Sequence, residues 1–532
     1  MSIPYLAERN GQKILMVEDK PFIMLAGEVH NSNSSSVKYM EGVWEKAQKL
    51  GMNSLLMPVT WEMVEPEEGK FDFSVVDGLI LQARMLGKHI GFLWFGAWKN
   101  AQCYYAPAWV KKNLTTFRRA EMKKGENYCN LEKFYGMPYT SLSYLCEATK
   151  TADAKAFATL MEHIREIDEK DNTVIVVQVE NETGVMGEAR EQSDLADELF
   201  ASPVPQDFVD YMKSHTETMV EPIKTAVQSG AASGSWAEVF GTAADEIFSA
   251  YYIAGYVNTV AAAGKEKYPL PMTVNCWLDK GAEPGIYPSG GPVRKVMEVW
   301  KYCAPAIDVM GPDIYVPNFC EICDAYSQNG NPLFIPECAT HSYAGLRQVY
   351  TVGHHHAMCY SPFGFEEMGE PFSAQQMYLF GADVDDPALQ TPQNVDEYRF
   401  FSESLQEMMP LLCEKYGTSD LQAVISESEE NKMMFGELGI MTMGQMPGAP
   451  KRTGVCMAVK VSEDTFYLLV KGMMVIPFST NPEKPHLDVL VLEDGHFENG
   501  EWKPCRRLNG DEVASMNYNE PTLLKLQLFA YK

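Results

Sequence analysis

The stretch VIVVQVENETG, Val174 to Gly184, decides the fold. Five of its first six residues are apolar, and turn-forming residues bound the run on both sides. A short apolar run of this kind is typical of a strand buried on both faces, as in parallel sheets. Glu180, Asn181 and Glu182 then follow at the C-terminal end of the strand, the edge where α/β barrels place their chemistry. The plainer alternative is a polar strand end that merely reaches solvent.

Strands and helices alternate along most of the chain. Between residues 37 and 50, for example, apolar residues recur at helical spacing, and Gly51 is placed to end that helix. The expected strands cover residues 21–30, 54–61, 89–98, 174–179, 270–277, 306–315, 332–337 and 357–365. Eight such units predict a (β/α)8 TIM barrel. An open doubly wound sheet is the alternative, but no G-x-G-x-x-G follows the first strand.

The pattern changes past about residue 415. Helical periodicity stops, and short runs of alternating apolar and polar residues lie between Gly, Pro and Asn turns, as in 465–471, 487–492 and 523–531. We therefore expect a catalytic barrel over residues 1–415, with insertions near 99–150 and 185–268, and a C-terminal β-sandwich over residues 416–532. Covering and rigidifying the barrel is a more natural role for the sandwich than independent carbohydrate binding.

Charge and composition limit the partners. The 44 Lys and Arg against 72 Asp and Glu give a net charge of −28, which disfavours nucleic acid and anionic membranes and favours a small neutral substrate. The sequence contains no apolar run of about 18 residues, so we expect no membrane span. The N-terminus leaves no room for a signal-peptide core, and the cysteines lie scattered among apolar residues, so we expect a cytoplasmic protein. A monomer and a symmetric homo-oligomer both fit this size.

Carboxylates, amides and aromatic rings dominate the expected strand ends. Asparagine and glutamate hydrogen-bond sugar hydroxyls, and aromatic faces stack on pyranose rings. The candidate substrate-binding residues are Glu28, Trp61, Trp98, Asn181, Asn275, Trp277 and Tyr315. Glu337 ends the buried run PLFIPE and would face Glu182 across the barrel. Two such carboxylates are the minimum apparatus for glycoside hydrolysis. A salt bridge from Glu337 to a barrel arginine is the structural alternative.

Two motifs resemble glycoside hydrolase family 35, the β-galactosidases. QVENETG, residues 178–184, is similar to that family's Gln-x-Glu-Asn-Glu-aromatic-Gly signature, and WEMVEPEEGKFDF, residues 61–73, is similar to its Trp-x-x-x-Glu-Pro-x-x-Gly-x-Phe-Asp-Phe run. The β-rich tail resembles the bacterial branch that carries a C-terminal domain. The chain differs at Thr183, where the family has an aromatic residue, and has WFGAWKN after the third strand in place of a Cys-Ala-Glu-Trp-type loop.

The resemblance implies a retaining β-galactosidase. Glu182 would be the acid/base, Glu337 the nucleophile, and Asn181 the partner of the hydroxyl next to the anomeric centre. Two alternatives stay open: another exo-β-glycosidase on the same barrel, acting on glucosides, fucosides or arabinopyranosides, and a non-catalytic sugar-binding protein.

Two further motifs have plainer explanations. Three adjacent histidines on a helix, His354 to His356, point in different directions, so a preformed metal site is not expected there. Cys320 and Cys323 form a C-x-x-C without a second pair at zinc-finger spacing, and we expect them to be structural. The sequence thus predicts an enzyme that needs neither a metal nor a cofactor.

Overall fold

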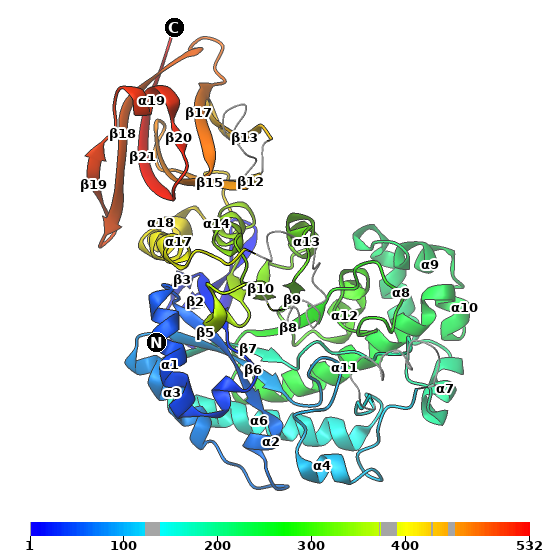
Figure 1. Ribbon diagram of the computed structural model, residues 1–532. Helices are drawn as coiled ribbons and strands as arrows, with labels where there is room; N and C mark the ends of the chain where they lie inside the picture. Colours follow the sequence, from blue (N-terminus) through cyan, green and yellow to red (C-terminus); the bar gives the residue numbers. More distant parts are fainter. Residues whose placement is uncertain (1, 123–138, 372, 374–390, 427–428, 445–452) are drawn as a thin grey trace.

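The computed structural model shows a closed barrel of parallel strands with an antiparallel β-domain stacked on it (Figure 1). It describes residues 2–122, 139–371, 373, 391–426, 429–444 and 453–532. The barrel closes in the order β10-β11-β4-β5-β6-β7-β8-β9, with strands β4 (Met24–Glu28), β5 (Ser54–Thr60), β6 (His89–Phe95), β7 (Val174–Val179), β8 (Met272–Trp277), β9 (Val309–Ile314), β10 (Phe334–Cys338) and β11 (Cys359–Pro362). The predicted TIM barrel is confirmed, and closure excludes the open sheet.

Helices surround the barrel because each buries one apolar face against the strands. In α1 the Ser36 side chain accepts a hydrogen bond from the Tyr39 backbone N–H at the start, and Gly51 follows the last turn with a φ of 67°. Among the described residues, no helix is long and apolar enough to cross a membrane. The helices that return between strands are α1 (Val37–Lys49), α2 (Trp61–Val64), α3 (Ser74–Met85), α6 (Glu147–Asp168), α11 (Ala244–Lys267), α12 (Met297–Cys303), α13 (Phe319–Tyr326) and α14 (Ala344–His354), and α17 (Val395–Glu407) and α18 (Met409–Lys415) come after β11.

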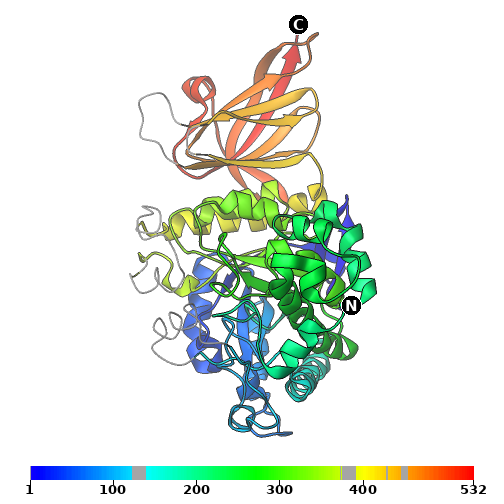
Figure 2. The ribbon, with the colours of Figure 1, turned by 90° about the vertical axis from the view of Figure 1, so that its right-hand side faces the viewer.

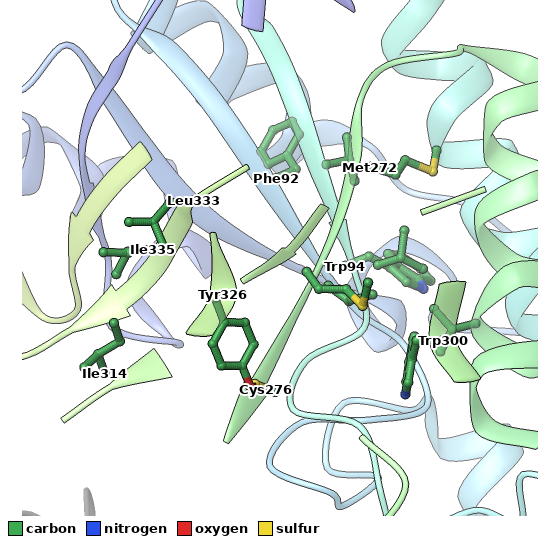
Figure 3. Close-up of a cluster of buried hydrophobic side chains, with 14 of the residues drawn as sticks. Phe92, Trp94, Met272, Cys276, Trp300, Ile314, Tyr326, Leu333 and Ile335 are labelled. Atoms are coloured by element: carbon green, nitrogen blue, oxygen red, sulfur yellow. The ribbon is translucent and has the colours of Figure 1, made fainter. Parts of the chain in front are cut away.

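Strand alternation divides the core into an inner and an outer layer. Met24 and Ala26 of β4 pack inside the barrel, whereas Leu25 between them packs with the surrounding helices. Figure 3 shows part of the outer layer, where Trp300 of α12 and Tyr326 of α13 lie among side chains of the strands. A barrel filled in this way is a packed core, so any site must lie at one of its ends.

A small antiparallel sheet precedes the barrel and differs from the sequence expectation, which began the strands at residue 21. It consists of β1 (Tyr5–Arg9), β2 (Gln12–Val17) and β3 (Lys20–Phe22). Leu15 and Val17 of β2 pack with the inner layer and so cover the end of the barrel where strands begin. Polar residues interrupt these short strands, which leaves only a weak pattern in the sequence.

Two excursions leave the C-terminal ends of β6 and β7. The first lies between β6 and α6 and contains α4 (Ala108–Lys112). The second contains α7 (Asp194–Ala201), α8 (Gln206–Ser214), α9 (Ile223–Ser229) and α10 (Trp236–Phe240), which gather on one side of the barrel (Figure 1). Trp236 lies at the centre of an aromatic cluster with Phe208, Phe248 and Tyr251, and this cluster holds the second excursion on α11.

The C-terminal domain is a sandwich of two antiparallel sheets (Figure 2). The six-stranded sheet has the order β12-β15-β16-β21-β18-β19, and the four-stranded sheet has the order β13-β14-β17-β20. The predicted β-sandwich is therefore confirmed. Its elements are β12 (Leu421–Ser426), β13 (Asn431–Phe435), β14 (Leu438–Met443), β15 (Gly454–Lys460), β16 (Thr465–Lys471), β17 (Met473–Ser479), β18 (His486–Glu498), β19 (Glu501–Arg507), α19 (Asp511–Ser515), β20 (Asn517–Tyr518) and β21 (Thr522–Tyr531).

The sandwich docks on helix α14 through β12 and β15. Alternate residues of β15 face opposite ways: Met457 joins the core of the barrel, whereas Cys456 and Ala458 join the core of the sandwich. Gly353 allows the close approach, because a Cβ at this position would lie 2.6 Å from Ala423 Cβ and 2.7 Å from Met457 Cγ. A side chain larger than hydrogen at position 353 would push the two domains apart.

Candidate active site

The two glutamates singled out in the sequence meet at the C-terminal ends of the strands. Glu337 lies in β10, and Glu182 follows β7. A carboxylate oxygen of each lies within 4.8 Å of the other and of a carboxylate oxygen of Asp313, which lies in β9. Glu182 is 6% exposed and Glu337 is 4% exposed. The barrel thus brings three buried carboxyl groups together at one point.

Donor groups surround the Glu337 carboxylate. The Tyr315 hydroxyl donates to Oε2 at 2.9 Å, and the amides of Asn275 and Asn181 donate to Oε1 at 3.3 and 3.4 Å. The ammonium of Lys99 lies 4.0 Å from the same Oε1. These contacts come from four different strand ends, so they fix the carboxylate in one orientation.

Glu182 is held by its backbone, and its surroundings raise the pKa of its carboxyl group. Its backbone N–H donates to Asn275 Oδ1 at 2.9 Å, and its φ of 43° is unusual for a residue with a side chain. Burial, and next the charge of Glu337, raise the pKa of Glu182 to about 7, against smaller opposing effects of Lys99 and of a hydrogen bond with Asp313. A carboxyl group in this state can donate a proton near neutral pH.

Asp313 belongs to the site, although the sequence interpretation did not include it. Asn275 Nδ2 donates to its Oδ2 at 2.8 Å, and burial, followed by the charges of Glu337 and Glu182, raises its pKa well above the ordinary value. Asp313 pairs in register with Glu337 across β9 and β10. Its position two residues before Tyr315 could have indicated that Asp313 faces the site, because residues i and i+2 of a strand share a face.

Lys99 is the second residue that sequence reasoning missed. It begins a tight turn in which the backbones of Lys99 and Gln102 exchange two hydrogen bonds, at 2.8 and 3.0 Å. Its side chain is 5% exposed, and its ammonium lies 5.0 Å from the centre of the Phe95 ring. Burial by itself would lower the pKa of Lys99, but the carboxylates, Glu337 first and Glu182 next, raise it above the ordinary value. A lysine in this position stays charged and offsets part of the carboxylate charge.

Glu28 ends β4 and faces the same cluster. It is fully buried, and neither carboxylate oxygen has a hydrogen-bond partner within the described part of the chain. Burial, and next the charge of Glu337, raise its pKa well above the ordinary value. The Asn181 Oδ1 is likewise buried and unpaired among those residues. Buried polar atoms without partners suit a ligand that supplies donors, such as the hydroxyls of a sugar.

The predicted aromatic residues divide into two groups. The indole N–H of Trp61 donates to Glu65 at 2.9 Å, and that of Trp98 donates to the Gly184 carbonyl at 3.2 Å, so both rings support the site from within the protein. Trp277 ends β8 and Tyr315 follows β9, and both are partly exposed. Contact of any of these rings with a substrate stays a prediction.

A second pair of carboxyl groups supports the site from below. Glu180 accepts the Trp98 backbone N–H at 2.8 Å, and Asp153 of α6 accepts from Trp94 and Tyr256, each at 2.9 Å. Burial raises the pKa of Glu180 well above its ordinary value, and Asp153 raises it further by charge and by a hydrogen bond, so the two carboxyls share a proton. A Cβ on Gly96 would lie only 2.6–2.7 Å from both carboxylates, which restricts that position to glycine.

Comparison with protein families gives two matches. Residues 14–93, which run from β2 into β6, match the model of Glycosyl hydrolases family 35. This match confirms the resemblance to family 35. Residues 403–518 match a Domain of unknown function, DUF5597. The family match supports a glycoside hydrolase. It covers Glu28 and Trp61 but neither Glu182 nor Glu337, so the roles of those two residues stay predictions.

Other comparisons add little. No curated protein matches the chain. A β-galactosidase from Rahnella sp. R3 is 15% identical over 76% of this chain and 58% of its own length, with a TM-score of 0.47. A β-galactosidase from Bacillus circulans sp. alkalophilus is 12% identical over 96% and 99% of the two chains, with a TM-score of 0.45. A third, from the psychrophilic Marinomonas ef1, is 13% identical over 74% and 61%, with a TM-score of 0.45.

The chain spans roughly three fifths of the length of the Rahnella and Marinomonas enzymes. Likenesses this low say nothing about activity or substrate.

Proposed function

We propose that this glycoside hydrolase is a retaining enzyme that releases terminal β-D-galactose from β-galactosides by double displacement. The spacing of Glu182 and Glu337 carries the proposal. Retaining glycosidases hold their two carboxyl groups about 5–5.5 Å apart, whereas inverting ones leave about 6.5–9.5 Å for a water molecule. One carboxylate oxygen of Glu182 lies within 4.8 Å of one of Glu337, and this short spacing favours the first class.

In the first step Glu337 attacks the anomeric carbon while Glu182 protonates the departing oxygen. Tyr315, Asn181 and Asn275 aim the Glu337 carboxylate, and the Lys99 ammonium beside it favours the negative charge that attacks. A pKa of about 7 leaves Glu182 roughly half protonated at neutral pH, so the acid is available there.

In the second step Glu182 changes from acid to base. Once Glu337 has formed an ester with the sugar it carries no charge, and the second largest cause of the raised pKa of Glu182 disappears. The pKa of Glu182 therefore falls in the glycosyl-enzyme, and its carboxylate takes a proton from the attacking water. Water attacks from the face that the leaving group vacated, and the product keeps the β configuration.

The charge of the site favours a neutral sugar. Glu28, Glu182, Asp313 and Glu337 converge on one place near the cation Lys99, and those of the four carboxyl groups that are ionised would repel an anionic substrate. Glu28 and Asn181 offer unpaired acceptors for sugar hydroxyls, and the latter lies beside Glu337, where the hydroxyl next to the anomeric carbon would lie. The choice of galactose rests on the resemblance to family 35.

A panel of nitrophenyl glycosides tests the proposal. We expect the β-D-galactoside to give the highest kcat/KM among the β-D-galactoside, β-D-glucoside, β-D-fucoside and α-L-arabinopyranoside. Glu337→Gln, which keeps the shape of the side chain but removes the nucleophile, should abolish turnover on every one of them. Preference for another glycoside would correct the sugar but keep the mechanism. Sugar binding by the wild-type chain without release of nitrophenol would contradict the proposal as a whole.

A further inference from the structure

The histidine tract at the end of α14 lies far from the candidate active site, at the junction with the sandwich. His356 is fully engaged there: its Nε2 lies 3.1 Å from the Leu421 carbonyl, and its Nδ1 accepts the Gly417 backbone N–H at 3.0 Å. It joins the barrel to the first strand of the C-terminal domain. His354 and His355 have other partners, and, contrary to the expectation from the sequence, one nitrogen of each lies close to the other.

His355 presents a buried lone pair. The Ser327 hydroxyl donates its hydrogen to the Cys323 carbonyl at 2.8 Å, so it accepts from His355 Nδ1, 3.1 Å away. That bond puts the hydrogen of the neutral ring on Nδ1 and leaves the lone pair on Nε2. The side chain is 5% exposed, and its Nε2 has no hydrogen-bond partner in the described structure. The Asp324 carboxylate lies 3.7 Å from this nitrogen.

His354 is oriented in the same way. Its Nδ1 lies 3.0 Å from the Ala423 carbonyl of β12, which can only accept, so this nitrogen carries the hydrogen and the other carries the lone pair. Its ring also stacks on Tyr350, with centroids 4.9 Å apart and planes 18° apart. One nitrogen of each imidazole and one oxygen of Asp324 lie within 4.8 Å of one another. Metal-binding histidines are held by the same device, a hydrogen bond from the nitrogen that does not bind the metal.

We propose that His354, His355 and Asp324 form a site for a divalent transition-metal ion of the Zn²⁺ class. Two imidazole nitrogens and a carboxylate oxygen this close together are a donor set that suits such an ion. Imidazole nitrogen favours zinc, nickel, cobalt or copper over magnesium or calcium, which prefer oxygen.

The site needs only a small adjustment to bind metal. Zinc binds nitrogen at about 2.0–2.1 Å and carboxylate oxygen at about 2.0–2.2 Å, so the three ligands must move closer together than 4.8 Å. The Asp324 side chain is 60% exposed and can swing inward, whereas the two imidazoles are already held. A bound ion would link α13, the end of α14 and, through the bond from His354 to Ala423, the sandwich.

Titration of the full-length, tag-free and chelator-treated chain with Zn²⁺ tests this site. We expect one ion per chain by calorimetry and a higher thermal midpoint, with Mg²⁺ giving neither. Asp324→Asn and His354→Gln should each weaken Zn²⁺ binding by about tenfold or more. Both positions are exposed, so both variants should fold, and circular dichroism checks this.

Asp77→Asn is the matched control, because Asp77 also forms a close histidine–aspartate pair, 2.6 Å from His163 Nε2, and no cluster with a second imidazole is found there among the described residues. It should leave Zn²⁺ binding unchanged. Absence of binding by the wild-type chain, equal binding by Asp324→Asn and His354→Gln, or an equal shift of the midpoint with Mg²⁺ would each overturn the proposal.

Discussion

Lys99 is the residue whose replacement tests the electrostatics of the site most sharply. Its ammonium lies 4.0 Å from Glu337 Oε1, and both side chains are buried. Two unit charges about 4 Å apart interact by about 4 kcal/mol at an effective dielectric constant of about 20. Lys99→Met keeps the length of the side chain and removes the charge. Because about 1.4 kcal/mol corresponds to a tenfold change in rate, we expect kcat/KM to fall by up to about 10³-fold.

The pH profile of Lys99→Met gives a second, independent readout. Lys99 lowers the pKa of Glu182, which burial and Glu337 together raise to about 7. Without the lysine this pKa rises further. The limb on which kcat/KM falls as Glu182 loses its proton should therefore move from about pH 7 to a higher pH. Stopped assays with a nitrophenyl glycoside between about pH 5 and 9 measure it.

Lys111→Met is the control for this variant. Lys111 lies 3.4 Å from Glu62 and is partly exposed, so its replacement removes a lysine–carboxylate contact outside the carboxylate cluster. It should change neither the rate nor the profile appreciably. An unchanged kcat/KM in Lys99→Met, or a basic limb that moves to lower pH, would refute the reasoning, provided that the variant keeps its near-ultraviolet circular dichroism.

Two further variants probe other parts of the site. Glu182→Ala should lose about 10²–10⁴-fold on substrates with poor leaving groups, and azide should restore turnover and give the β-glycosyl azide; formation of the α-azide would contradict the assigned role. Glu180→Ala should lower the unfolding free energy by about 1–3 kcal/mol, because it leaves the buried Trp98 N–H unbonded. Glu180→Gln should cost less and should flatten the pH dependence of stability. Burial and Asp153 raise the pKa of Glu180 in the folded state, so wild-type stability falls as the pH rises above the ordinary pKa that Glu180 has in the unfolded chain. Equal slopes of stability against pH for wild type and Glu180→Gln, measured by calorimetry between about pH 5 and 8, would disprove the shared proton.

The barrel was predictable because its strands are buried on both faces. Each of the eight gives a short apolar run with turn residues at its ends, and all eight occur where the sequence indicates them. The sheet β1 to β3 was not predictable, because its strands are short and half exposed. This sheet contributes Leu15 and Val17 to the core of the barrel. Their burial depends on the barrel that they cover and not on any local sequence pattern.

The site was predictable only as far as strand ends reveal it. Glu28, Asn181, Glu182, Asn275, Tyr315 and Glu337 all come together as expected, because parallel strands bring their C-terminal ends to one edge. Lys99 reaches the cluster through a tight turn after β6. The pattern of apolar residues in a strand does not predict where the side chains of the following turn point. Trp61 and Trp98 show that a strand-end position does not by itself identify a ligand-binding residue. The indole N–H groups of both residues bond within the protein.

The anomeric configuration of the first product tests the central claim most directly. Proton NMR during hydrolysis of a nitrophenyl β-D-galactoside separates the two anomers before they equilibrate. A carboxylate pair with oxygens within 4.8 Å predicts that the β anomer appears first and the α anomer grows later by mutarotation. Initial release of the α anomer would show that water attacks the substrate directly, and would contradict the assignment of Glu337 as a nucleophile.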